Sequence, residues 1–250
     1  MPSHITSSRH SRTAVVALAA GLLLYGCSFE DAGHKTAAAD ATVTEAVTAV
    51  EVKDARRGSI EVTPGAGPGV TIRRTVHYRG DRAPEPAQQV SAGVLTFTAG
   101  CSDSCFIDYR LEVPASATVR LESSSGRIAV AGVSAADLST SSGEVTADRI
   151  AGPLKVRTSS GSITATALTG PTAELHASSG EARLAFAKPP ASVTARTGSG
   201  DVTLTVPQAP YEITTTTASG DRDTLPSTPQ AASHLAVHTA SGDIRITSAS

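Results

Sequence analysis

The sequence predicts an all-β protein built as a parallel β-solenoid of about seven coils, and three observations carry this prediction. A Ser-Gly phrase recurs seven times between Thr118 and Thr247. The glycines of this phrase lie 17, 18, 19, 20, 20 and 22 residues apart. Alternating apolar and polar residues precede each phrase, which is the pattern of a strand with one buried face. A regular period near 20 residues is typical of a repeat architecture.

The glycines of the phrase are predicted to form the corners of the coils, because glycine reaches positive φ without a steric clash and serine hydroxyls bond nearby backbone. These turn glycines are Gly126, Gly143, Gly161, Gly180, Gly200, Gly220 and Gly242. The residue two places after each glycine is apolar in six of the seven units, so we expect this position to face a common core. Arg222 is the exception, and it suggests that the sixth unit opens into a loop.

An antiparallel sandwich is the alternative fold, in which each phrase would be the tip of a β-hairpin. A sandwich gives no reason for the same tip to recur at a nearly fixed period, whereas stacked coils must match at every corner. The solenoid is therefore preferred. Seven coils at about 4.8 Å per strand spacing would extend about 30 Å. The chain ends soon after 244–247, so that edge of the stack is expected to be open to pairing.

Composition limits the kind of core and the kind of partner. The chain has 250 residues, with 3% aromatic residues and no Trp, so the core must consist of Val, Ile, Leu and Ala. Small β-branched residues suit a narrow solenoid interior. A formal net charge of −2 gives no electrostatic basis for binding nucleic acid.

The N-terminal residues predict export. An apolar run at 14–24 follows Arg9 and Arg12, and it is the length of a signal-peptide core, too short to span a membrane. The run ends in Leu-Tyr-Gly-Cys27, which resembles the lipobox of bacterial lipoproteins; the resemblance implies that Cys27 is lipidated and becomes the first mature residue. Ordinary secretion with an unmodified Cys27 is the alternative. We expect a signal peptide at 1–26 and a flexible tether at 27–42.

Residues 43–116 are predicted to form an N-terminal β cap with the first coils. Strands are expected at 43–52, 59–63, 70–78 and 94–98, with a Pro-rich loop at 79–89. Cys101 and Cys105 bracket Ser-Asp-Ser, and in an exported protein they are expected to form a disulfide. A metal or redox site would need a CxxC-like spacing or further ligands nearby. The solenoid repeats are expected at 117–250.

The repeats also carry a family resemblance. The phrase Thr-x-Ser-Gly-(Asp/Glu)-(Val/Ile) appears at 140–145, 197–202 and 239–244, after a strand that closes in Leu-Glu-Val-Pro114. This pattern resembles a predicted-adhesin β-solenoid family, a domain of unknown function related to auto-transporter-adhesin head domains. The resemblance covers about 43–250. It implies a right-handed parallel β-solenoid exposed on the cell envelope, and it supplies no catalytic residues.

Candidate metal sites and nucleophiles are weak. Acidic residues follow five of the turn glycines: Glu144, Glu181, Asp201, Asp221 and Asp243. A stacked row could bind calcium, but the calcium-roll nonapeptide is missing, so solvation of the turns is favoured. His234 and His238 would lie about 13 Å apart on the outer face of a strand, too far for one ion. No Gly-x-Ser-x-Gly motif distinguishes any serine.

We therefore expect a non-catalytic lipoprotein on the outer face of the cell membrane, whose β-solenoid surface serves adhesion or binding of a glycan or an envelope protein. The alternative is a structural or sensory envelope lipoprotein that self-associates or binds a protein partner. A polysaccharide-active β-helix enzyme is less favoured, because hydrolysis needs two convergent carboxylates. No cofactor, metal or nucleic acid is expected.

Overall fold

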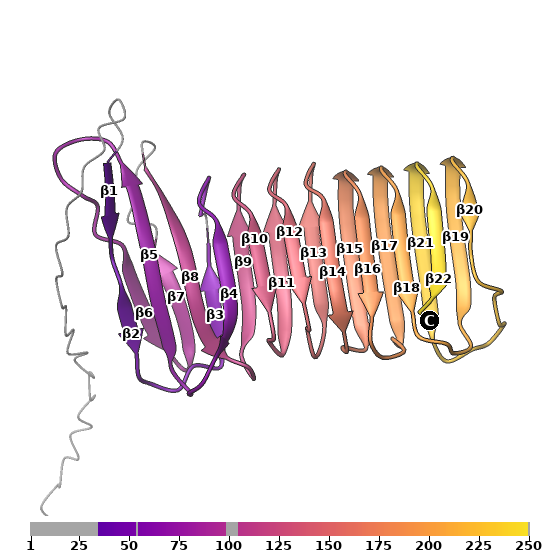
Figure 1. The fold of residues 1–250 in the computed structure, drawn as a ribbon, viewed down its shortest axis with the longest axis horizontal. Helices are drawn as coiled ribbons and strands as arrows, with labels where there is room; N and C mark the ends of the chain where they lie inside the picture. The colour runs from indigo at the N-terminus through magenta and orange to yellow at the C-terminus, as the bar shows by residue number, and fades with distance from the viewer. Residues whose placement is uncertain (1–34, 54, 99–104, 250) are drawn as a thin grey trace, which may run out of the picture.

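The computed structural model describes residues 35–53, 55–98 and 105–249, and this part of the chain is all-β. Two sheets face each other along a rod: sheet 1 has 12 strands and sheet 2 has 10 (Figure 1). The predicted signal peptide at 1–26, Cys27 and Cys101 lie outside the described residues. Within the described ranges, no helix has the length and apolar character needed to cross a membrane.

The repeat section is a stack of strand pairs, in which each pair gives one strand to sheet 2 and the next strand to sheet 1. Neighbouring strands run parallel and in register, as between β9 and β11 or β10 and β12. The prediction of an all-β repeat fold is confirmed, and the antiparallel sandwich is wrong for this section. The pairs are β9 (Thr118–Ser123) with β10 (Ile128–Ala131), β11 (Ala135–Thr140) with β12 (Val145–Asp148), β13 (Leu154–Thr158) with β14 (Ile163–Leu168), β15 (Thr172–Ser179) with β16 (Ala182–Phe186), β17 (Ser192–Ser199) with β18 (Val202–Val206), β19 (Glu212–Ser219) with β20 (Arg222–Asp223), and β21 (His234–Ser241) with β22 (Ile244–Ser248).

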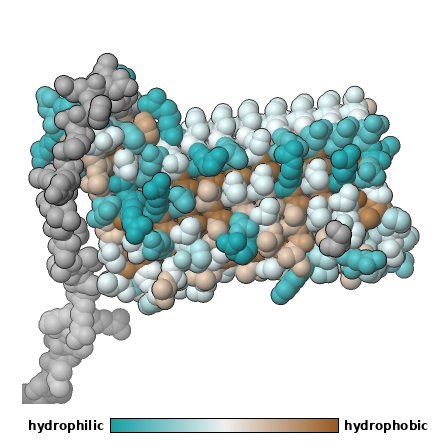
Figure 2. Space-filling view, viewed as in Figure 1, coloured by the Kyte–Doolittle hydropathy of each residue, from teal (hydrophilic) through white to brown (hydrophobic). Residues whose placement is uncertain are grey.

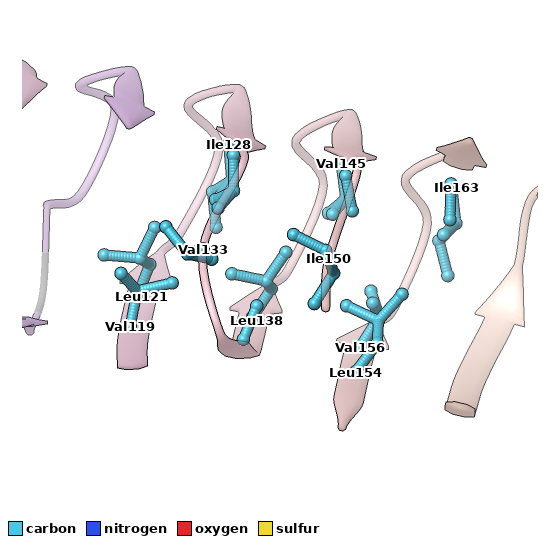
Figure 3. Close-up of a cluster of buried hydrophobic side chains, with 14 of the residues drawn as sticks. Val119, Leu121, Ile128, Val133, Leu138, Val145, Ile150, Leu154, Val156 and Ile163 are labelled. Atoms are coloured by element: carbon cyan, nitrogen blue, oxygen red, sulfur yellow. The ribbon is translucent and has the colours of Figure 1, made fainter. Parts of the chain in front are cut away.

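The core is a set of apolar rows between the two sheets. Leu121, Leu138 and Val156 are register partners in sheet 2, and all three are buried (Figure 3). The residues two places after the turn glycines form the facing row in sheet 1. This expectation is confirmed for its six apolar members: Ile128, Val145, Ile163, Ala182, Val202 and Ile244. Full burial of a Val, Leu or Ile side chain contributes about 1.5–3 kcal/mol, so these rows dominate the stability of the stack.

The last two strand pairs stack in the reverse of their sequence order. In sheet 2 the order is β17, β21, β19, so the C-terminal pair is inserted between the fifth and sixth pairs (Figure 1). The segment 224–233 makes the return: Ser227 Oγ accepts the N–H of Ile213, and Thr228 N–H donates to the carbonyl of Tyr211. The expectation that 244–247 forms the open edge is therefore wrong, because β19 and β20 are the end strands.

The N-terminal strands extend the stack and then change direction. β3 (Ala49–Val52) and β4 (Ile60–Gly65) are parallel to β9 and β10. β7 (Val94–Thr98) and β8 (Phe106–Pro114) pair in parallel with β3 and β4. Antiparallel strands then cover this end: β5 (Val70–Tyr78) pairs with β8, and β6 (Ala87–Ser91) pairs with β7.

Part of the expected tether is folded. β1 (Lys35–Ala38) and β2 (Ala41–Val43) pair with β5 in antiparallel register. The prediction of a flexible tether at 27–42 is therefore wrong for the described residues from Lys35 onward. The small residues of 35–43 are too weakly apolar for their alternation to predict a strand. In the structure, β5 supplies the hydrogen-bond partners that order β1 and β2.

A buried arginine joins these N-terminal strands. Arg74 is 5% exposed, and its guanidinium donates to the carbonyls of Ala39 (2.7 Å) and Pro86 (3.2 Å) and to the side-chain oxygen of Gln88 (2.8 Å). Burial lowers the pKa of the Arg74 guanidinium from its ordinary value. Two separate segments, at Ala39 and at 86–88, are therefore joined to β5 by one side chain.

Candidate functional site

A polar groove runs along the rod where the strands of sheet 2 enter their corners. Four consecutive strands, β9, β11, β13 and β15, each contribute three residues to it, because their parallel register places equivalent residues side by side. The groove has a volume of about 570 Å³. Its twelve lining residues are Glu122, Ser123, Ser124, Ser139, Thr140, Ser141, Arg157, Thr158, Ser159, His176, Ala177 and Ser178. Figure 2 shows that weakly polar side chains form rows along the rod, broken by separate hydrophilic patches.

Hydroxyl groups line the floor of the groove in a fixed orientation. The N–H of Gly126 donates to Ser123 Oγ (3.0 Å), that of Gly143 to Thr140 Oγ1 (3.0 Å), and that of Gly161 to Thr158 Oγ1 (2.9 Å). Three of the four corners therefore hold a buried floor hydroxyl, and Ala177 takes the equivalent position in the fourth. Outside this floor, Ser124, Ser141, Ser159 and Ser178 form a second row at the same spacing.

Charged side chains form the other wall, and most of them are paired. Arg157 donates to Asp137 (3.2 Å), and His176 Nε2 lies 3.0 Å from Glu174 Oε1. This hydrogen bond from His176 lowers the pKa of the Glu174 carboxyl. The pairing holds the side chains upright without a large net charge, so the groove suits a neutral or weakly charged polar ligand.

The groove is not arranged for hydrolysis. Glu122 is the one carboxylate among the twelve lining residues, whereas glycoside hydrolysis uses a pair of carboxylates across the scissile bond. The arrangement offers hydrogen-bond donors and acceptors that repeat with the strand spacing of about 4.8 Å. It can therefore hold an extended polymer by many equal contacts.

The predicted turn glycines are brought together in one column, but for a different reason than expected in the first corners. Gly126, Gly143 and Gly161 do not have positive φ. A Cβ on Gly161 would lie 1.9 Å from the carbonyl oxygen of Gly143, so close stacking of the corners excludes any side chain. Positive φ, as predicted, does occur at Gly180, Gly200, Gly220 and Gly242. The sequence motif is thus explained mainly by the approach of one coil to the next.

The acidic residues that follow the later glycines bond to backbone of the neighbouring coil. Asp243 N–H donates to Asp201 Oδ1 (2.8 Å), and Asp221 N–H donates to Asp243 Oδ1 (2.8 Å). No group of three or more His, Cys, Asp or Glu side chains that could hold a metal ion occurs in the part of the chain that the structure describes. These carboxylates cap the corners, which was not visible from sequence.

A Ser, His and Asp cluster was missed by sequence reasoning. Ser59 donates to Asp108 Oδ1 through both its N–H and its hydroxyl (2.7 Å each), and His77 Nε2 lies 2.8 Å from Asp108 Oδ2. His77 also stacks on Phe106, with 4.3 Å between ring centroids. The aspartate sits between the other two groups, so the serine hydroxyl does not face the imidazole as a nucleophile faces its base. The cluster joins β4, β5 and β8 and is structural.

The remaining predicted residues separate into two groups. Cys105 is buried and disulfide-bonded, while Cys101 lies outside the described residues, so the pairing of these two cysteines stays a prediction. His234 and His238 lie on strand β21 and are exposed, as expected. His234 pairs with Glu212 (3.3 Å) on the neighbouring strand.

Comparison with known proteins gives a family but no established activity. Among solved structures, similar chains include a predicted cell adhesion protein from Clostridium sporogenes, with 9% identity, 86% of this chain and 100% of that chain covered, and a TM-score of 0.37. A predicted adhesin from Bacteroides fragilis has 12% identity, coverage of 86% and 97%, and a TM-score of 0.48. One from Parabacteroides distasonis has 11% identity, coverage of 86% and 96%, and a TM-score of 0.38. None of the curated proteins matches the chain. Residues 89–247 match the Toastrack DUF4097 family, and this is more than half of the chain, so the protein belongs to that family.

Proposed function

We propose that this protein is a non-catalytic, adhesin-like binding protein of the cell envelope, and that the groove of sheet 2 binds a linear glycan. The observation that carries the proposal is the groove itself, with its serine row repeated over four coils and its floor hydroxyls in three of them. Because these contacts are equal and modest, affinity would come from their number along one ligand chain. The mechanism is display of a rigid surface without chemistry.

The proposal includes an anchor and a handedness. Cys27 would carry the lipid, residues 28–34 would form the tether, and the coil would be right-handed with the N-terminal strands as its cap. Each buried acyl CH₂ contributes about 0.8 kcal/mol, so two or more chains would hold the protein on the outer face of the membrane. Mass spectrometry of the mature N-terminus tests the anchor: we expect a lipidated Cys27, and an unmodified Cys27 would contradict it.

A glycan array with the whole chain tests the groove. The chain carries Cys27→Ser, so that no lipid obscures binding. Ser141→Gln places a larger neutral side chain in the groove, and Thr194→Gln is the matched control on the same face at β17, outside the lining residues. We expect at least a tenfold loss of glycan binding with Ser141→Gln and no loss with the control. Absence of any retained glycan, or equal binding by both variants, would contradict the proposal.

A second candidate role is structural or sensory, through self-association or an envelope partner. The observation that favours it is the open strand β19 at the end of sheet 2. Sizing of the purified chain separates the two roles: oligomers that grow with concentration favour self-association, and a monomer that retains glycan favours adhesion alone.

A further inference from the structure

The end of the rod opposite the N-terminal strands is an unpaired strand edge. β19 is the last strand of sheet 2, and its one neighbour there is β21. The chain does not end at this strand; it returns through 224–233 and places its final pair inside the stack. An exposed edge presents a row of unpaired N–H and C=O groups to which another strand can add.

The hydrogen bonds identify which groups face outward. The N–H of Glu212 donates to the carbonyl of Ser233, so the even-numbered residues of β19 direct their backbone groups toward β21. The odd-numbered residues direct theirs away from the sheet. At Ile213 the outward N–H donates to Ser227 Oγ (2.9 Å), so the returning segment occupies that position. The outward groups beyond it belong to Thr215 and Thr217, because the carbonyl of Ser219 accepts the N–H of Gly242 and so faces the stack.

This edge lacks the features that usually prevent strand addition. Natural edges are blunted by Lys, Pro or a bulge. The strand Glu-Ile-Thr-Thr-Thr-Thr-Ala-Ser has no basic residue and no proline, and its register with β21 is continuous from Glu212 to Thr217. Its one charge, Glu212, is paired with His234 at 3.3 Å. The threonines are residues of high strand propensity.

We propose that β19 pairs in antiparallel register with β19 of a second copy, around a two-fold axis at Thr216. Backbone groups that point outward must face groups that also point outward. This register places Thr215 opposite Thr217 of the second copy, so both outward residues of each copy are used. It leaves Glu212 outside the paired segment, so like charges do not meet. Registers shifted toward Ile213 are blocked by Ser227.

The inference is independent of the glycan groove and has a geometric consequence. β1 and β2 lie at the other end of the rod from β19 (Figure 1). A dimer through β19 therefore joins two rods tail to tail and sets their N-terminal ends far apart. A contact through one strand edge is smaller than the standard interface of about 1,200–2,000 Å², so the dimer is expected to be weak. Its formation should be visible only at high protein concentration.

Sedimentation velocity of the whole chain with Cys27→Ser tests the dimer over a wide concentration range. Thr215→Pro removes an outward N–H and no bond to β21, so the monomer should stay folded. Thr216→Lys adds a charge to the outer face of the same strand, and Thr194→Lys is its control on an interior strand. We expect a reversible dimer of the parent and the control, and at least a tenfold weaker dimer for Thr215→Pro and Thr216→Lys. A parent that remains monomeric, or folded edge variants that dimerise like the parent, would overturn the proposal.

Cysteine cross-linking tests the register without relying on affinity. In the proposed dimer Thr216 lies opposite Thr216 of the second copy, so a chain with Thr216→Cys should oxidise to a covalent dimer. The matched variant Thr214→Cys places its cysteine opposite Ala218 of the second copy, where no second cysteine is present. Strong cross-linking of Thr216→Cys alone supports the register. Equal cross-linking of both variants, or of neither, contradicts it.

Discussion

Replacement of Gly161 by alanine is the sharpest test of why glycine recurs at the corners. The new Cβ would lie 1.9 Å from the carbonyl oxygen of Gly143 and 3.0 Å from the Thr158 hydroxyl. Because Gly161 does not have positive φ, the substitution adds little backbone strain of its own. The clash can be relieved only if one coil moves away from the next by more than about 1 Å. Hydrogen bonds between the coils are about 2.7–3.2 Å long, so this movement would break those at the corner.

The structure sets the expected magnitude. Ser159 and Ser160 both donate to the carbonyl of Ser141 at this corner (3.2 and 2.8 Å), and the N–H of Gly161 donates to Thr158. Loss of two or three hydrogen bonds costs about 1 kcal/mol each, and overpacking adds about 1–3 kcal/mol. We therefore expect Gly161→Ala to lower the free energy of unfolding by about 3–6 kcal/mol.

Two control glycines separate the possible causes. Gly67 and Gly80 have no atom within 4 Å of an added Cβ, and Gly80 alone of the two has positive φ, at 109°. Urea unfolding should show almost no effect for Gly67→Ala and an effect of about 1 kcal/mol for Gly80→Ala. If Gly161→Ala costs less than Gly80→Ala, then close stacking of the corners does not explain the motif.

Three further predictions concern the hydrogen-bonded and titratable groups. Arg74→Met should lower the free energy of unfolding by about 3 kcal/mol, because it leaves three partly buried oxygen acceptors without the guanidinium; a loss under 1 kcal/mol in urea unfolding would contradict this. Burial raises the pKa of Tyr109 to about 12, so the unfolded chain loses this proton first and stability falls as the pH rises from about 10 to 12. Tyr109→Phe should remove about 1 kcal/mol of the stability difference between pH 9 and pH 11, and an unchanged difference would refute the assignment. Asp243→Ala should lower the free energy of unfolding by about 1–2 kcal/mol and speed hydrogen exchange at the N–H of Asp221, which loses its acceptor. Asp243→Asn should keep most of this bond through its amide oxygen. An unchanged exchange rate at Asp221 in the alanine variant would count against the hydrogen bond between the two corners.

The stacked rows could be predicted from sequence because their signal is periodic. Val, Ile and Leu alternate with polar residues, and the period of the Ser-Gly phrase fixes where each row begins. The parallel direction of the strands could also be predicted from sequence. The same corner recurs at a nearly constant period, and each corner must fit against the equivalent corner of the next coil. Which strand pair ends the stack was not predicted from sequence, although two residues of that pair indicate it. Thr215 occupies an inward position where its neighbour Val237 is buried, and Arg222 replaces an apolar residue. A unit with polar inward positions is one that lacks a neighbour on one side.

The groove could not be predicted, because it exists only through register between residues that are 17 to 19 positions apart. Glu122, Ser139, Arg157 and His176 share no sequence motif, yet the parallel ladder places them in one row. The same is true of Ser59, His77 and Asp108, which come from three separate segments of the chain. Periodicity identifies which face a residue occupies. It does not identify which charges or hydroxyls will be neighbours along the rod.

Distances between spin labels along one row of sheet 2 test the stacking most directly. Cysteine replacements at Arg120, Ala236 and Thr214 place labels in the same outward row, at the first strand of the repeats and at its last two. With a strand spacing of about 4.8 Å, the account predicts about 24 Å from Arg120 to Ala236 and about 29 Å from Arg120 to Thr214, before the length of the labels is added. A shorter distance to Thr214 than to Ala236, or distances that do not grow with position in the stack, would contradict it.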